Sequence, residues 1–158
     1  MQPIHLMDSA IEALERRMSA MPPVAAMQVR VEGLAEHGGL CLHAPLAANV
    51  NDKGCAFGGS LAGLMTLACW GSVTLALERA GLGAAEVFVQ DSSIEYLTPL
   101  YEDLRAEARL EPGQDWTGLV RAFRERGRAR ARLAASIRSR DGTLAARLDG
   151  RFVALARS

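Results

Sequence analysis

Hydrophobic and polar residues follow several distinct patterns along the chain, and each pattern predicts one type of element. In residues 8–21 apolar side chains recur every three or four positions, which is typical of an amphipathic helix. The apolar residues on that face are Ile11, Leu14 and Met18. Ser9 and Glu12 have the spacing of a capping box, and Pro22 and Pro23 are expected to end the helix.

Most other segments have the composition or alternation of strands. Two strands are expected around the turn His37-Gly38-Gly39, and several more follow the middle of the chain. The predicted strands are residues 27–32, 40–45, 87–97, 104–110, 119–139 and 144–156. The run at 119–139 is rich in arginine and interrupted at Gly127, and Asp141-Gly142 is typical of a hairpin turn.

The longest apolar segment lies in the middle of the chain. Residues 54–77 contain no charged side chain over 24 positions, and a membrane span needs about 20 apolar residues. However, three glycines and Ser60 occupy the first part as a loop, and no basic cluster flanks either end. We therefore expect residues 61–77 to form a helix that is apolar on all sides because protein covers it, ending near Gly81.

Together these elements predict an α+β fold in which an antiparallel sheet wraps around one long central helix. The length fits a single domain, residues 1–158, in which residues 1–22 form a short N-terminal helical lead-in.

Composition narrows the function classes. The formal net charge is zero, so neither nucleic acid nor an anionic membrane is an expected partner. Cys41, Cys55 and Cys69 form no CxxC pair and no cluster with histidine, which argues against a disulfide framework and against a metal site. The N-terminus lacks a basic segment followed by an apolar one, so we expect no secretion signal and a cytoplasmic location.

The most polar loop directly precedes the most apolar helix. Residues 49–60 read NVNDKGCAFGGS, and Gly59 or Ser60 is expected near the N-cap. The first turn of a helix has backbone N–H groups without intrahelical partners and the positive end of the macrodipole. Such donors can stabilise an oxyanion. The alternative is that Gly-Gly-Ser only makes a tight turn.

The pattern N-x-x-G-x-x-F-G-G from Asn51 to Gly59 resembles the N-x-x-G-x-x-H-G-G signature of hotdog-fold acyl thioesterases. More closely, NVNDKGCAFGGSLAGLMTLACW resembles the YiiD C-terminal-domain family of thioesterases, over roughly residues 20–157. The residues that fit this family are Asn51, Gly54, Phe57, Gly58, Gly59, Ser60, Thr66, Trp70, Gly71, Asp91, Ile94, Tyr96, Pro99, Arg126, Gly127 and Arg128.

The resemblance implies a hotdog fold, a homodimer or dimer of dimers, and acyl thioesters of coenzyme A or acyl carrier protein as substrates. It implies no cofactor other than the coenzyme A or phosphopantetheine of the substrate. The sequence differs from the family pattern at two positions, so the usual hotdog mechanism cannot simply be assigned to this chain. Thr66 stands where many hotdog thioesterases have a carboxylate, and Phe57 stands where they have histidine. A non-catalytic acyl-thioester binding module is therefore the alternative, and a hydratase or dehydratase is weaker because such enzymes need both missing groups.

Four residues are candidates for the chemistry. The N–H of Gly59 would hold the oxyanion, and Asn51 would orient water or the carbonyl unless it is only a turn residue. Asp91 is either a base with a pKa raised by partial burial or a strand-edge carboxylate beside Ser92 and Ser93. Thr66 would support a water unless it only bonds its own helix backbone.

The remaining candidates would bind the substrate. They are Asp52, Lys53, Phe57, Gly58, Ser60, Arg126 and Arg128. Asp52 and Lys53 also fit a solvated loop pair. Cys55 is either a nucleophile or, since no histidine is near it in the sequence, a structural residue. Arginines at every second position from Arg124 to Arg132 fit a solvated strand face, or a face that receives phosphates or an acidic carrier protein.

Overall fold

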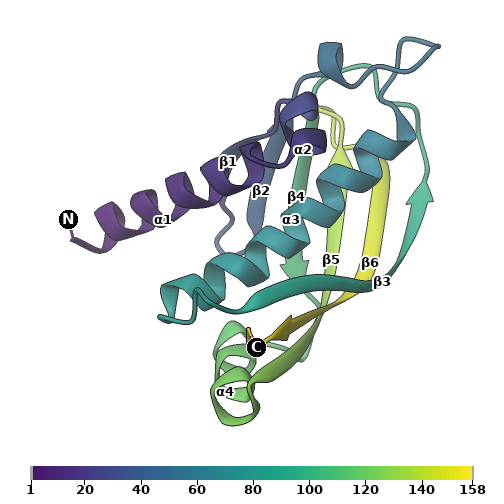
Figure 1. Ribbon diagram of the computed structural model, residues 1–158. Coiled ribbons are helices and arrows are strands. Elements are labelled where there is room, and N and C mark those ends of the chain that lie inside the picture. Colours follow the sequence, from purple (N-terminus) through teal and green to yellow (C-terminus); the bar gives the residue numbers. More distant parts are fainter. Residues whose placement is uncertain (1, 158) are drawn as a thin grey trace.

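The computed structural model describes the backbone of residues 2–157 and the side chains of residues 9–157 (Figure 1). The elements in chain order are α1 (Gln2–Ser19), α2 (Pro22–Met27), β1 (Arg30–Leu34), β2 (Leu40–Ala44), a 3-10 turn (Leu46–Ala48), α3 (Gly58–Arg79), β3 (Glu86–Tyr96), β4 (Leu104–Leu110), α4 (Trp116–Arg126), β5 (Arg128–Arg138) and β6 (Leu144–Leu155).

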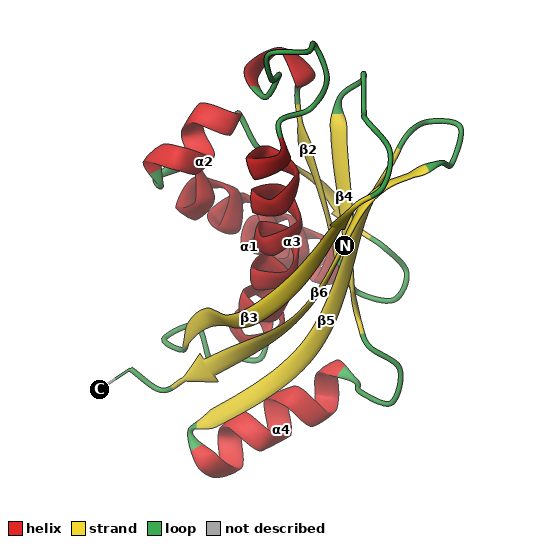
Figure 2. Cartoon of the chain, turned by 90° about the vertical axis from the view of Figure 1, so that its right-hand side faces the viewer, coloured by secondary structure: helices red, strands yellow, loops and turns green. Residues whose placement is uncertain are grey.

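The strands form one six-stranded antiparallel sheet in the order β1-β2-β4-β5-β6-β3. Figure 2 shows α1, α2 and α3 together on one side of this sheet. The face toward α3 is called the inner face and the other the outer face. This arrangement confirms the predicted α+β fold with an antiparallel sheet around one long helix.

The alternation along β5 shows how the sequence divides the two faces. The predicted apolar positions are buried on the inner face; they are Ala129, Ala131, Leu133, Ala135 and Ile137. Arg128, Arg130 and Arg132 alternate with them and are exposed on the outer face. The period of two therefore sets the register of the sheet against the helix.

Small residues let α3 approach the sheet closely. A Cβ atom on Gly71 would lie 2.6 Å from the side chain of Leu40 on β2. The N–H of Leu40 donates to the Ser72 hydroxyl at 2.9 Å, and that hydroxyl donates to the carbonyl of Ala68 at 2.7 Å. By length and composition alone α3 could cross a membrane, yet 72% of its most apolar 18-residue window is buried within the fold.

Two N-terminal boundaries differ from the prediction. The first helix begins at Gln2, so Ser9 lies inside α1 and its predicted capping role is wrong. Pro22 and Pro23 follow the end of α1 but also start α2, because proline fits the first turn of a helix. Met27 ends α2, so the first strand begins at Arg30 rather than at Met27.

The predicted strand at 119–139 is wrong in its first part. Residues Trp116–Arg126 form α4, whose N-cap Asp115 accepts from the N–H of Gly118 at 2.6 Å. Leu119 and Phe123, four positions apart, bury the inner side of this helix. Consequently Arg124 and Arg126 lie on a helix and do not continue the strand face that begins at Arg128.

Candidate functional site

The loop before α3 ends in a turn whose backbone donors are free. The N-cap is Phe57, two positions before the predicted Gly59, and Gly58 and Gly59 are the first two helical residues. Ser60 and Leu61 donate their N–H groups to the Phe57 carbonyl at 2.9 and 3.0 Å. Within the described part of the chain, the N–H groups of Gly58 and Gly59 have no partner. We call Phe57–Gly59 the glycine turn.

Asn49 holds this turn in place, a role that the sequence analysis did not assign. Its side chain is only 3% exposed, and its amide donates to the carbonyls of Met27 at 2.9 Å and Pro45 at 2.8 Å. The N–H of Phe57 donates to the Asn49 carbonyl at 2.8 Å. Asn49 is the first asparagine of the N-x-N pattern, which was the available signal.

Asn51 uses its polar groups within the loop. Its side-chain oxygen accepts from the N–H groups of Lys53 at 2.8 Å and Cys55 at 3.2 Å. Its amide donates to the Cys55 sulfur at 3.2 Å. These bonds match the turn interpretation of Asn51 and place Cys55 as a buried structural residue with a free thiol.

Aromatic rings flank the glycine turn. Phe57 and Tyr96 are 55% and 56% exposed. A Cβ atom on Gly59 would lie 2.5 Å from the Phe57 ring, and one on Gly58 would lie 3.6 Å from the Tyr96 ring. The free N–H groups therefore lie beside exposed apolar surface that could receive an apolar ligand or a second protein chain.

Thr66 lies on the same side of α3 as Gly59 but about 10 Å further along the helix axis. Its side chain is half-buried, and its hydroxyl donates to the carbonyl of Ala62 at 2.8 Å. In a single chain, Thr66 therefore does not reach the glycine turn.

Asp91 is exposed on the outer face, opposite α3. Its carboxylate accepts from Nε of Arg151 at 2.9 and 3.1 Å. The hydrogen bonds and charge of Arg151 lower the pKa of Asp91, which contradicts the first of the two alternatives for this residue, a base with a raised pKa. A base needs a carboxylate that can take up a proton near neutral pH, and this ion pair opposes that.

The predicted substrate-binding residues are not all brought together. Phe57 and Gly58 belong to the glycine turn, and Ser60 follows it on α3. Asp52 and Lys53 make an exposed ion pair at 2.9 Å in the same loop. Arg126 and Arg128 lie where α4 meets β5, at the other end of the sheet (Figure 1). Among the described residues, no group of histidine, cysteine and carboxylate side chains could hold a metal ion.

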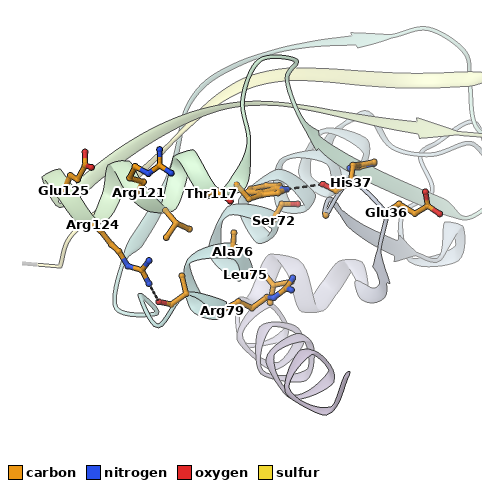
Figure 3. Close-up of a pocket in the computed structure, with 14 residues that line it drawn as sticks. Glu36, His37, Ser72, Leu75, Ala76, Arg79, Thr117, Arg121, Arg124 and Glu125 are labelled. Atoms are coloured by element: carbon orange, nitrogen blue, oxygen red, sulfur yellow. Dashed lines mark hydrogen bonds between the residues drawn. The ribbon is translucent and has the colours of Figure 1, made fainter. Parts of the chain in front are cut away.

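A large cavity lies away from the turn, between the second half of α3, the β1–β2 turn and α4 (Figure 3). It measures about 930 Å³ and mixes apolar residues such as Leu75 with the charged Arg79, Arg121 and Glu36. Trp116 donates to the His37 carbonyl at 3.1 Å across its rim. None of Asn51, Gly59 and Thr66 lines it. This cavity was not predicted, because most of α4 was predicted as a strand.

The family model described as "Putative thioesterase (yiiD_Cterm)" matches residues 11–156. The chain belongs to this family. The match confirms the resemblance that the loop and the start of α3 indicated. In this YiiD C-terminal family member the matched residues include the glycine turn, α4 and the whole sheet.

Solved structures share the fold of this YiiD C-terminal family member. A protein of unknown function from Chlorobaculum tepidum TLS is 27% identical with a TM-score of 0.85, over 96% of this chain and 97% of that one. A "putative thioesterase" from Shewanella oneidensis is 29% identical with a TM-score of 0.81, over 94% and 99%. A thioesterase from Haemophilus influenzae, 15% identical with a TM-score of 0.69 over 92% and 90%, shares the fold alone.

These matches confirm the hotdog fold. A search of curated proteins finds no match to this chain.

Proposed function

We propose that this protein hydrolyses acyl thioesters of coenzyme A or acyl carrier protein, with the N–H groups of Gly58 and Gly59 holding the thioester carbonyl oxygen. The observation that carries the proposal is the pair of partnerless donors at the positive end of α3. Membership of a family described as "Putative thioesterase" supports this reaction class.

The reaction needs little beyond an oxyanion site and a positioned water. The water oxygen bonds to the carbonyl carbon, negative charge develops on the carbonyl oxygen, and the C–S bond then breaks. Thiols are much stronger acids than alcohols, and that of cysteine has a pKa of about 8.5. The leaving group can therefore depart as a thiolate, which takes up the proton that the water loses. Each oxyanion donor in such sites contributes about 3 to 4 kcal/mol.

A second copy of the chain is the partner that we propose. β3 pairs only with β6, so its other edge is unpaired in the described chain. It is 11 residues long, and Phe88, Val89 and Tyr96 on it are exposed apolar residues. A long edge strand that exposes apolar side chains favours pairing with another strand. Antiparallel pairing of two β3 strands would join two sheets into one.

The open side of α3 supports the same partner. Gly59, Ala62 and Thr66 lie one above another on this helix and are exposed or half-buried, while most of α3 is buried. A second copy along β3 would cover this side. Thr66 of that copy is our candidate for holding the water, because its own proton is already donated to Ala62. Its oxygen can therefore only accept a hydrogen bond from the water, which leaves a water lone pair free to attack.

The test is thiol release from acyl-coenzyme A and from acyl carrier protein, over a series of acyl chain lengths. We expect turnover with a preferred chain length. A different result, in which acyl-coenzyme A raises the melting temperature but no thiol appears, would contradict hydrolysis and support the binding-module alternative.

A further inference from the structure

A hollow lined by arginines, called the arginine hollow, lies on the outer face of the sheet, where β5 and β3 begin and β6 ends. Its volume is about 430 Å³, and it is lined by Gln90, Arg126, Arg128, Ala129, Arg130, Val153 and Leu155. Three of the seven are arginines, and none is acidic. Arg128 and Arg130 are neighbours on one face of β5, about 7 Å apart along the strand.

Several other outer arginines of the sheet pair with a carboxylate; the pairs are Arg105–Glu32, Arg109–Glu107, Arg147–Glu95 and Arg151–Asp91. Among the described residues, Arg126, Arg128 and Arg130 have no ion-pair partner. Within the same described part of the chain, Arg132 and Arg138 on β5 also lack an ion pair, but neither of them lines the hollow. Glu86 on β3 lies on the same face and is level with Arg128, because both are paired with Leu155 of β6. Two strand spacings separate Glu86 from Arg128, a distance of about 10 Å. Three guanidinium groups that line one hollow without a counter-charge repel one another, and an anion would relieve this repulsion.

An apolar surface adjoins the charges. Arg130 is in register with Val153 on β6, and Val153 with Phe88 on β3, so these side chains form one row across the outer face. Phe88 is 49% exposed and Leu155 is 39% exposed. Arginine forks match phosphate oxygens, and an exposed aromatic ring provides a surface on which a nucleobase stacks.

We infer that the arginine hollow binds the phosphorylated adenine nucleotide of a coenzyme A thioester. This rests on the proposed function, and it selects coenzyme A rather than a carrier protein as the source of the acyl group.

The position of the hollow fits a site shared between two copies. Tyr96, which lies beside the glycine turn, is eight positions after Phe88 on β3, a distance of about 26 Å along the strand. Antiparallel pairing of two β3 strands brings the start of one strand beside the end of the other. The hollow of one copy would then lie near the Tyr96 end of its partner, and the carrier arm would pass around that end to the glycine turn.

The experiment measures coenzyme A binding by calorimetry, using free coenzyme A, pantetheine and inorganic phosphate with the full chain. The variant is Arg128→Gln combined with Arg130→Gln. The control is Arg138→Gln, which removes a charge from the far end of the same strand, where the guanidinium only donates to the Gly142 carbonyl. We expect coenzyme A to bind, pantetheine to bind at least tenfold more weakly, and the double variant to lose at least tenfold in affinity for coenzyme A.

Hydrolysis separates this inference from the proposed function. In the double variant KM for acyl-coenzyme A should rise while kcat/KM for an acyl-N-acetylcysteamine thioester, which has no nucleotide, stays unchanged. Equal coenzyme A affinity in wild type and double variant would overturn the inference. It would also be overturned if the double variant lost only the hydrolysis of acyl carrier protein thioesters, or only its affinity for inorganic phosphate. Absence of hydrolysis with both thioesters, together with intact coenzyme A binding, would contradict the proposed function only.

Discussion

Phe57 is an unusual N-cap, and its chemistry suits a ligand at the glycine turn. Most helices begin with serine, threonine, aspartate or asparagine, whose side-chain oxygen accepts an N–H of the first turn. Phe57 offers no such acceptor, and no side-chain cap is present. The donors of the first turn therefore stay available, at a small cost in helix stability. An oxygen at this position would compete with a substrate oxygen for the same groups.

Replacing Phe57 by aspartate should separate stability from activity. Phe57→Asp introduces a capping carboxylate, so we expect the free energy of unfolding to rise by up to about 1 kcal/mol, since the lost side chain is largely exposed. The carboxylate would also repel a developing oxyanion, so kcat/KM should fall at least tenfold. Denaturant unfolding and thiol release measure the two effects, with Phe57→Leu as the uncharged control. Unchanged activity in the aspartate variant would count against an oxyanion at this turn.

Thr66 offers a second test at the residue scale. Thr66→Val keeps the shape but removes the hydroxyl, and we expect kcat to fall about tenfold or more because the water loses its acceptor. Thr66→Ser keeps the hydroxyl and should retain most of the activity. Melting temperatures should change little, because the hydroxyl bonds only its own helix. Equal rates for the valine variant and wild type would remove Thr66 from the mechanism.

At the scale of elements, patterns with a strong period were predicted well. The central helix was expected at 61–77 and extends over Gly58–Arg79, and the inward residues of β5 were all identified. The helix α4 was missed because Arg124 and Arg126 continue the alternation of β5 backwards, although Asp115 and Gly127 were recognisable cap residues. The prediction of a strand therefore followed the arginines at every second position and passed over the cap residues that mark the start and end of the helix.

The β5–β6 hairpin gives a pH-dependent prediction. The Ser139 hydroxyl and the Thr143 N–H donate to Asp141, which lowers the pKa of its carboxyl from 3.8 to about 2. A lowered folded-state pKa stabilises the protein fully above pH 3.8, and this contribution is lost as the pH falls through about 2. Unfolding followed over this range should show falling stability in wild type and a shallower fall in Asp141→Asn. A slope identical in both would contradict a role for Asp141; Ser139→Ala, which removes one donor, should be intermediate.

At the scale of the whole molecule, the sequence could not show how the candidate residues are arranged. Asn51 and the glycine turn were placed correctly in one loop, but Thr66, Asp91 and Arg128 lie on different surfaces of the chain. Asp91 in particular faces outward because the β-bulge between Val89 and Asp91 changes which side chains face α3. Asn49 was overlooked because its importance comes from buried contacts with Met27 and Pro45 that are distant in the sequence.

Dimer formation along β3 is the prediction at this scale. Val89→Arg places a charge on the exposed edge strand, so we expect it to shift the protein from dimer toward monomer and to lower hydrolysis in parallel. Light scattering after size exclusion gives the mass, and Ala25→Arg on the exposed surface of α2 is the control. A wild-type monomer with full activity would contradict a site shared between two copies.

The central claim is that the backbone of the glycine turn holds the thioester oxygen, and a pair of glycine variants tests it most directly. Gly59→Ala would push the exposed Phe57 ring, which lies 2.5 Å from the new Cβ atom, across the free N–H groups. Gly63→Ala, on the next turn of the same helix, makes only an ordinary 3.6 Å contact with Met27 and should stabilise the helix by about 0.5 to 1 kcal/mol.

The deciding measurement is kcat/KM for thioester hydrolysis in these two variants and wild type. We predict a loss of about 100-fold in Gly59→Ala with a nearly unchanged melting temperature, and wild-type activity in Gly63→Ala. Equal hydrolysis by Gly59→Ala and wild type would contradict the account.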